Sequence, residues 1–391
     1  MTGSERGQTA FPADTVMVGE YANPADPVDP VGPVDSLDSV APAREGVRRR
    51  ETGSGTWRVR LRRALRATSR PGPWKRGPVL AALALLLGLL MLAHASITDR
   101  GGLGSLVETF LPWSALFVPV LFAGALWRRS ASATLALLLP VTVWLNLFGG
   151  LLVDKSHAGG DLTVVSHNVD ADNPDPTGTA RDLIASTADV LALEEITPQA
   201  KPRYEKALAK TYPYHAVRGT VGLWSKLPLS DTEPVDIKQD AGPMGEAKSA
   251  EATLPYTRAL RTTVATEHGP LAVYVAHLGS VRVVPGVGFA TDDRDRHAKA
   301  LAEAVAAEPN ERVVVLGDLN GTMDDRAFAD LTAHLDSAQE TAGDGFGFTW
   351  PSNFPVARID QILVRGVAPA SSWVLPATDS DHLPVAAGLT W

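Results

Sequence analysis

The chain of 391 residues contains no cysteine. Disulfide bridges, thiolate metal sites and cysteine nucleophiles are therefore excluded. The sequence also lacks any internal repeat of solenoid length, which argues against a repeat architecture. An extracytoplasmic location stays open, but it has to be argued from topology instead of from disulfide bonds.

The net charge of -8 at pH 7 conceals three blocks of opposite sign. Residues 1–43 hold seven acidic residues and one basic residue, residues 44–76 hold two acidic and twelve basic, and residues 151–391 hold 33 acidic and 20 basic. The first block is rich in Pro, Ala, Asp and Gly, so we expect a disordered tail there. The second block mixes arginines with apolar residues, which favours a short basic helix on anionic lipid over a nucleic-acid-binding arm.

Long apolar runs follow the basic block, over about residues 77–97, 110–127 and 131–153. Because a helix needs roughly 20 apolar residues to cross the hydrocarbon core, we expect three transmembrane helices. Ala93-His94-Ala95 resembles a signal-peptidase site. The region before the first run is far longer than a signal n-region, so the anchor is predicted to remain uncleaved.

Basic residues at the ends of the runs indicate how the chain is oriented. Twelve Lys and Arg residues lie in the block directly before the first run, Arg128 and Arg129 separate the second run from the third, and Arg100 is the only basic residue in the loop between the first and second runs. Positively charged loops stay in the cytoplasm. We therefore expect a multi-pass protein of the cell membrane, partnered by the lipid bilayer. Residues 1–76 form its cytoplasmic tail and residues 154–391 an extracytoplasmic domain.

Alternating strand and helix patterns beyond the third run predict an α/β or α+β domain. Strands are expected at residues 162–166, 190–193 and 313–316, a hairpin at 261–265 and 271–276, and helices at 179–186, 198–209 and 293–307.

Polar residues stand at the ends of these strands. The strand at 313–316 runs through Gly317 into Asp318 and Asn320, whose side chains point the same way in an extended segment. Each polar group alone has an ordinary explanation as a turn or a cap. The others are Asn168 with Asp170, Glu194 with Glu195, His277, Asp360, and Ser380-Asp381-His382.

The order of these groups resembles the endonuclease/exonuclease/phosphatase superfamily. Its members carry a strand-Asn, Leu-Gln-Glu, a strand-His, Gly-Asp-x-Asn, Ile-Asp and Ser-Asp-His, and all six blocks occur here from Asn168 to His382. The chain departs at Glu194, where the family usually has Gln. The resemblance implies a metal-dependent phosphohydrolase with a four-layer α/β/β/α sandwich, here preceded by three transmembrane helices.

The resemblance also implies a Mg²⁺ or Mn²⁺ cofactor. Glu195 is the first expected ligand, with Asn168 beside it, and Asp381 and Asp170 are possible contributors. Hard cations of this kind prefer oxygen ligands and neutralise charge on phosphate oxygens.

Catalytic roles follow from the same resemblance. Asp360 would orient His382, Asp318 would orient or deprotonate the attacking water, and Asn320 and His277 would donate to phosphoryl oxygens. The sequence leaves open whether Asp318 or His382 is the general base.

Three weaker predictions have no motif behind them. Residues 212–226, including Trp224, are expected by analogy to line the substrate cleft. Arg258 and Arg282 are candidate phosphate contacts.

The superfamily cleaves DNA, RNA, inositol phosphates, sphingomyelin and lipid-linked phosphates, so the fold does not choose a substrate. The acidic domain disfavours duplex DNA. The layout of tail, spans and outer domain resembles the VanJ-like actinomycete membrane proteins associated with teicoplanin resistance, which implies a phosphatase acting on a lipid-linked phosphate or pyrophosphate. A surface-anchored nuclease and a catalytically silent protein that binds cell-wall lipid are the alternatives. The sequence leaves the oligomeric state open.

Overall fold

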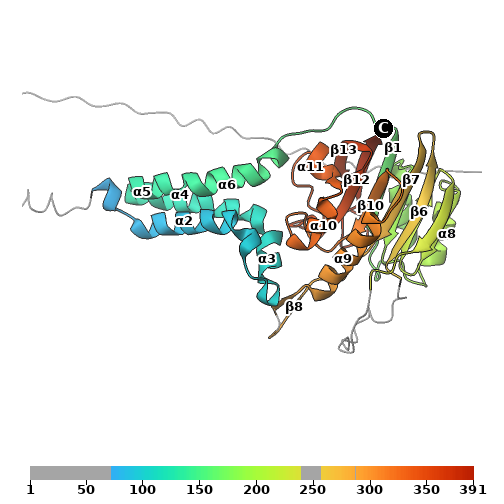
Figure 1. Cartoon of the computed structure of the whole chain (residues 1–391), viewed down its shortest axis with the longest axis horizontal. Coiled ribbons are helices and arrows are strands. Elements are labelled where there is room, and N and C mark those ends of the chain that lie inside the picture. The colour runs from blue at the N-terminus through green and yellow to red at the C-terminus, as the bar shows by residue number, and fades with distance from the viewer. Residues whose placement is uncertain (1–71, 239–256, 287) are drawn as a thin grey trace, which may run out of the picture. The chain divides into compact units, whose positions relative to one another are not determined.

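A computed structural model describes residues 72–238, 257–286 and 288–391. The predicted tail and most of the basic segment, residues 1–71, lie outside the described residues. The described chain opens with apolar helices and continues into a domain of two β-sheets with helices on their outer faces (Figure 1).

The region before the domain is helical. Its helices are α2 (Pro78–Leu92), α3 (Leu103–Thr109), α4 (Phe117–Arg128), α5 (Ala131–Ala136) and α6 (Leu138–Phe148). A 3₁₀ turn (Leu111–Leu116) continues directly into α4, and α5 is followed at once by α6. By length and composition, the continuous helical stretches Leu111–Arg128 and Ala131–Leu152 are able to cross a membrane. Helix α2 has 15 residues, fewer than the roughly 20 that a span requires, so the first predicted span is shorter than expected.

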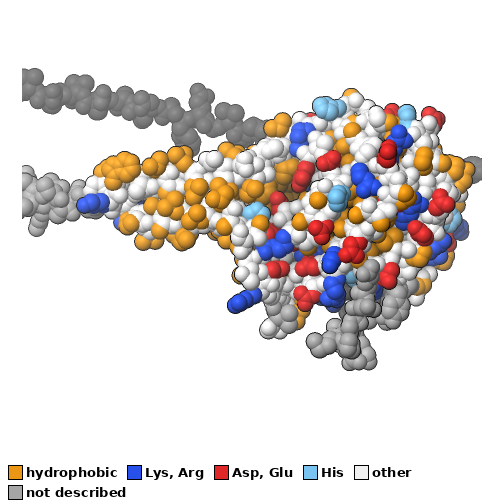
Figure 2. Space-filling model, in the orientation of Figure 1, with side chains coloured by type: hydrophobic (Ala, Val, Ile, Leu, Met, Phe, Trp, Pro, Cys, Tyr) orange, Lys and Arg blue, Asp and Glu red, His pale blue; other side chains and the backbone are white. Residues whose placement is uncertain are grey.

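The helical region leaves many large apolar side chains exposed. Leu86 is 61% exposed, Val120 68% and Trp127 89%, and Figure 2 shows hydrophobic side chains covering this part of the chain with few charges among them. A soluble protein rarely exposes a continuous apolar surface of this kind.

Two six-stranded sheets form the body of the domain. In sheet order, the first contains β13 (Ala368–Val374), β14 (Val385–Thr390), β1 (Leu162–Asn168), β2 (Val190–Glu194), β4 (Val221–Ser225) and β3 (Tyr214–Arg218). The second contains β11 (Asp336–Ser337), β12 (Asp360–Arg365), β10 (Val313–Asp318), β7 (Gly269–Ala276), β6 (Ala259–Thr266) and β5 (Leu229–Pro234). A separate hairpin pairs β8 (Arg282–Val284) with β9 (Gly288–Ala290).

Alternating side chains build the layers. Val164 of β1 packs in the core between the sheets, whereas its neighbour Val165 packs under α7 (Pro176–Ala185) and α8 (Lys201–Leu208). The same alternation occurs on β10. Val314 packs in the core between the sheets, and Val315 packs in the core under α9 (Asp292–Ala306) and α10 (Ala329–Thr332). A short helix, α11 (Ala338–Ala342), follows β11. The result is a mixed α/β fold with two sheets between helices, as expected.

The strands and helices expected in this domain are present close to their predicted ends. The predicted hairpin is β6 and β7, which pair antiparallel from Ala259 with Ala276 to Thr266 with Gly269.

Candidate active site

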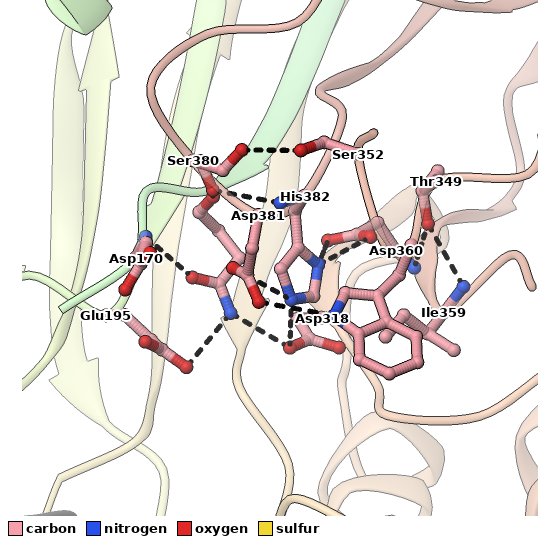
Figure 3. Close-up of polar contacts among 12 residues, drawn as sticks. Asp170, Glu195, Asp318, Thr349, Ser352, Ile359, Asp360, Ser380, Asp381 and His382 are labelled. Atoms are coloured by element: carbon pink, nitrogen blue, oxygen red, sulfur yellow. Dashed lines mark hydrogen bonds and ion pairs between the residues drawn. The ribbon is translucent and has the colours of Figure 1, made fainter. Parts of the chain in front are cut away.

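Strand register brings the predicted polar groups together. In the parallel pair of β1 and β2, Asn168 lies beside Glu194, and in the antiparallel pair of β10 and β12, Asp318 lies beside Asp360. The ends of both sheets thus supply one cluster of side chains (Figure 3). Asp170, Glu195 and Asn320 all have positive φ values, a conformation uncommon for residues other than glycine and often found at functional sites.

A histidine–aspartate pair forms the centre of the cluster. His382 Nδ1 donates to the two carboxylate oxygens of Asp360 at 2.9 and 3.1 Å. Backbone hydrogen bonds hold both residues of the pair in place. The His382 amide donates to Ser380 Oγ, and the Asp360 amide donates to Thr349 Oγ1. Burial lowers the pKa of His382, but the carboxylates of Asp360 and Asp318 outweigh burial and raise it to about 10. The imidazole is therefore a cation at neutral pH.

Asp318 is buried on the other side of this imidazole, with Oδ2 3.9 Å from His382 Nε2. Its Oδ2 accepts from the side-chain amides of Asn168 at 3.0 Å and Asn320 at 3.1 Å. Burial raises the pKa of Asp318 to about 7, even though His382 acts in the opposite direction. A carboxyl group with this pKa exchanges a proton near neutral pH.

His277 and Glu195 extend the cluster. His277 Nε2 lies 3.4 Å from Glu195 Oε1 and 3.6 Å from Asp318 Oδ2. Arg258 donates from Nη2 to His277 Nε2 at 2.7 Å, so that nitrogen acts as an acceptor. Burial, followed by the charge of Arg258, lowers the pKa of His277 well below its usual range. The ring is therefore neutral, and its proton sits on Nδ1.

The donor set fits a hard divalent cation. Glu195, His277 and Asp318 each offer a ligand atom within 4.8 Å of the others, and so do Asp318, Asp360 and His382. Carboxylate oxygens of this kind suit Mg²⁺ and Mn²⁺.

Asn168 and Asp381 differ from the geometry expected of metal ligands. The amide nitrogen of Asn168 faces Glu195 and Asp318, while its oxygen accepts from the Asp170 amide at 3.0 Å. A ligand role for Asn168 therefore requires the amide to be turned over. Asp381 lies outside both groups that could hold a metal, and its carboxylate accepts from the Trp350 indole at 3.2 Å.

Glu194, the departure from the family pattern, is fully buried. Ser166 Oγ donates to its Oε1 at 3.0 Å, and its Oε2 lacks a hydrogen-bond partner among the described residues. Burial, together with the nearby charge of Asp360, raises the pKa of Glu194 well above its usual range. This shift favours the neutral acid over the carboxylate, and a neutral acid resembles the glutamine amide that the family usually has.

Comparisons with known proteins agree with this arrangement. The sequence profile described as "Endonuclease/Exonuclease/phosphatase family" matches residues 165–382, which is more than half of the chain. The chain belongs to this family. Its members are metal-dependent phosphoesterases and nucleases, so the domain is that of an enzyme. No curated protein sequence matches the chain.

Three solved structures are similar to part of the chain at low sequence identity. A functionally unknown conserved protein from Enterococcus faecalis V583 is 15% identical with a TM-score of 0.47, covering 58% of this chain and 99% of its own. D. rerio TDP2 complexed with single-strand DNA product is 20% identical with a TM-score of 0.46, covering 59% and 99%. A mannosyl-6-phosphatase from Bacteroides thetaiotaomicron VPI-5482 is 17% identical with a TM-score of 0.45, covering 59% and 100%.

The structure corrects one of the weaker predictions. Trp224 is fully buried in the core under α7 and α8, so it does not line a cleft. It lies on β4, which is buried on both faces, whereas the prediction rested only on analogy. Arg282 is the first residue of the exposed strand β8, and its role as a phosphate contact stays a prediction.

Two residues of the site carried little or no signal in the sequence. Arg258 holds His277, donating from Nε to the His277 carbonyl at 3.0 Å as well as to the ring. Thr349 fixes the backbone at Ile359 and Asp360. For Arg258 the available signal was its position as a charged residue directly before an apolar strand. No sequence pattern indicated Thr349.

Proposed function

We propose that this chain is a membrane-anchored phosphoesterase, dependent on Mg²⁺ or Mn²⁺, that hydrolyses a lipid-linked phosphate or pyrophosphate at the outer face of the cell membrane. The observation that carries the proposal is one loop, residues 343–357, which contacts both the candidate active site and the apolar helices. The layout shared with the VanJ-like group supports a place in cell-envelope metabolism and a role in glycopeptide resistance.

The acid and base groups suit phosphate ester or anhydride cleavage. In the proposed reaction a carboxylate oxygen of Asp318 accepts the proton of the attacking water, because its pKa of about 7 matches neutral pH. His382 is held as a cation by Asp360 and offers Nε2–H to the phosphoryl or leaving oxygen. This assigns the base to Asp318.

A positioned donor would stabilise the charge that develops on the phosphoryl oxygens. Asn320 has a side-chain amide whose orientation is fixed by hydrogen bonds to Asp318 and to the Leu278 carbonyl. His277 is not given this role, because it is neutral and its Nε2 accepts from Arg258 and so carries no proton to donate.

A divalent cation bound here would neutralise charge on the phosphate oxygens. Glu195 would hold it, with Asn168 beside it once the amide is turned over, and Asp381 and Asp170 facing the same space from the neighbouring loops (Figure 3).

The loop at 343–357 supports a substrate presented by a membrane. Trp113, in the 3₁₀ turn ahead of α4, donates from its indole to the Val356 carbonyl at 2.8 Å and stacks on Phe348 at 5.6 Å. Phe346 packs against Trp144 of α6 at 6.2 Å between ring centroids. Thr349 and Trp350, in the same loop, reach Asp360 and Asp381. Aromatic residues are enriched at membrane interfaces.

The decisive experiment uses the full chain in detergent. Release of orthophosphate from a polyprenyl pyrophosphate and strand cleavage of DNA are measured side by side, with Mg²⁺, Mn²⁺ or EDTA. We expect metal-dependent release from the lipid, and a loss of about 10²- to 10⁴-fold in Asp318→Ala and in His382→Ala.

Matched controls are Asp330→Ala and His334→Ala, which truncate exposed residues of the same types on and just after α10. They are expected to keep wild-type rates. Cleavage of DNA without release of orthophosphate from the lipid would replace the lipid phosphatase with an anchored nuclease. No reaction of either substrate with a folded protein would favour the lipid-binding alternative.

A further inference from the structure

A buried ion pair joins the loop between the first two apolar helical segments to the catalytic domain. Glu108 of α3 is fully buried, and its carboxylate accepts from Arg326 Nη2 at 2.7 Å and from the Arg326 backbone amide at 3.1 Å. The same guanidinium donates to the carbonyls of Ile97 and His94, which lie just before α3. Arg326 thus binds three points of one short segment.

A second set of contacts lies beside the first. Ser105, one turn before Glu108 on α3, donates to Asp325 and accepts from Arg294 Nη2 at 3.0 Å. Arg294 of α9 is buried and forms an ion pair with Asp325 at 2.9 Å. We call Ser105, Glu108, Arg294, Asp325 and Arg326 the anchor network.

The anchor network extends to the backbone of an active-site residue. Arg294 Nη1 donates to the Asn320 carbonyl at 3.3 Å. Asn320 adopts a left-handed conformation with φ of 52°, which a non-glycine residue keeps only when its surroundings hold it. Arg294 also stacks over the Phe328 ring at 5.2 Å, so one side chain fixes both ends of the segment 320–328.

Close backbone approach shows that α3 and the domain fit without a gap. A Cβ added at Gly102, just before α3, would lie 1.7 Å from the Phe289 carbonyl oxygen, and one at Gly104 would lie 2.6 Å from Arg326 Nη2. Only glycine fits at Gly102, whereas a side chain at Gly104 would displace the Arg326 guanidinium.

We propose that α3 is a positioning element of the active site, which holds Asn320 and the loop 320–328 through Arg294. The proposal rests on the proposed function in treating Asn320 as a group that contacts substrate. The α3 segment is thereby part of the machinery and not only a tether.

Burial gives these contacts their expected weight. Removing one partner of a buried ion pair leaves the other charge uncompensated, which is far more costly than losing an exposed pair. Asp325 is matched by Arg294 within the domain, whereas Glu108 is matched by Arg326 across the contact. Loss of α3 would therefore leave Arg326 without this carboxylate and would remove the Ser105 hydrogen bonds to Asp325 and Arg294.

Hydrogen exchange of the full chain in lipid nanodiscs tests this coupling without any substrate. The variants are Ser105→Ala and Glu108→Gln on α3, and the matched control is Arg296→Gln, which changes an exposed arginine two positions from Arg294 on α9. We expect amides of the segment 319–328 to exchange about tenfold faster or more in both α3 variants, while β14 is unchanged. Arg296→Gln is expected to match the wild type.

Unchanged exchange of this segment in both α3 variants would overturn the proposal. Ser105→Ala removes only a hydroxyl group, so it decides the question even where Glu108→Gln does not fold. Because exchange needs no turnover, a wild type that hydrolyses no substrate would count against the proposed function and leave this readout intact.

Kinetics separate positioning from a merely structural role. With a substrate that the wild type hydrolyses, Arg294→Gln is expected to lower kcat about tenfold with little change in KM, and Arg294→Lys to restore part of the loss. Accelerated exchange with wild-type kcat in both α3 variants would show that the loop does not position Asn320 for catalysis, and would overturn that part of the proposal.

Discussion

Two clusters of charged residues, the anchor network and the candidate active site, lie on either side of the segment that follows β10. They differ in their balance of positive and negative charge. In the anchor network, Glu108 and Asp325 face two guanidinium groups, and the half-exposed Asp295 also pairs with Arg294. In the candidate active site, Glu195, Asp318 and Asp360 face His382 and Arg258 among the described residues, with Asp170 and Asp381 nearby. The five members of the anchor network balance one another in charge, whereas the described carboxylates of the active site outnumber its cations.

The difference explains what each cluster is able to do. A balanced set of charged hydrogen bonds fixes a structure, because each group has its partner before any ligand arrives. In the active site, burial raises the pKa of Asp318 and the charge of Asp360 adds to it, while the carboxylates of Asp360 and Asp318 raise the pKa of His382. An excess of carboxylates also attracts a cation. Perturbed pKa values of this kind gather at functional sites.

The largest effect expected from this comparison concerns metal binding. Addition of Mn²⁺ to EDTA-treated full chain should stabilise the wild type by about 2.7 kcal/mol at a hundred times the dissociation constant. Glu195→Gln keeps the shape of the side chain but removes a carboxylate from the unbalanced cluster, so it should abolish that stabilisation. The readout is the melting temperature by scanning fluorimetry, with and without metal.

Glu108→Gln is the matched control, because it makes the same substitution in the balanced cluster. It should lower the melting temperature in EDTA but keep the increase on adding Mn²⁺. Equal loss of the metal effect in the two variants would show that the clusters are not functionally distinct.

A smaller effect is expected in the pH dependence of stability. The pKa of His382 is raised from 6.5 to about 10 in the folded chain. Its contribution to stability is therefore fully present below pH 6.5 and is lost as pH rises through about 10. The difference in free energy of unfolding between wild type and His382→Gln, measured in EDTA, should shrink by a few kcal/mol across this range.

The balanced cluster should not follow this trend. The hydrogen bond to Glu108 raises the pKa of Arg326 still further, so the guanidinium stays charged throughout. The destabilisation caused by Arg326→Gln should be the same at pH 6.5 and pH 10. A parallel decline in both variants would point to a general loss of stability in alkali.

The sequence predicted the active-site cluster better than the anchor network, for a physical reason. The order of short motifs, through the family resemblance, placed Asp318 and Asp360 in one site, and the register of β10 with β12 in the structure sets the two residues side by side. Glu108 and Arg326 are 218 residues apart, and each is a single charge with no pattern around it. Their pairing depends on how α3 packs, and local periodicity does not encode that packing.

Burial was the other quantity that the sequence did not supply. Trp224 was expected in the substrate cleft, but β4 is covered on both faces, and only the assembled sheets reveal this. Likewise the motif marked Glu194 as a departure from the family's Gln, while its consequence depends on the complete burial of that side chain.

The smallest expected effect is that of Glu194→Gln, which restores the family's usual residue. Because the folded pKa of Glu194 is raised above 4.5, this group lowers stability increasingly as pH rises above 4.5. Removing its titration should raise the melting temperature at pH 7 by about 2–4 °C, and kcat/KM should stay within about threefold of wild type. The same isosteric change at the adjacent residue, Glu195→Gln, should abolish activity.

Glu194 and Glu195, adjacent at the end of β2, allow a buried glutamate to be compared with a partly exposed one. Both side chains are glutamates, yet Ser166 and the core enclose Glu194, whereas Glu195 faces the other polar groups and is partly exposed. If Glu194→Gln were as damaging as Glu195→Gln, Glu194 would have to be ionised in the working enzyme, and the excess negative charge of the site would be larger by one. Melting curves of Glu194→Gln from pH 5 to pH 9 decide this, because an ionised Glu194 would give a stability difference that does not grow with pH.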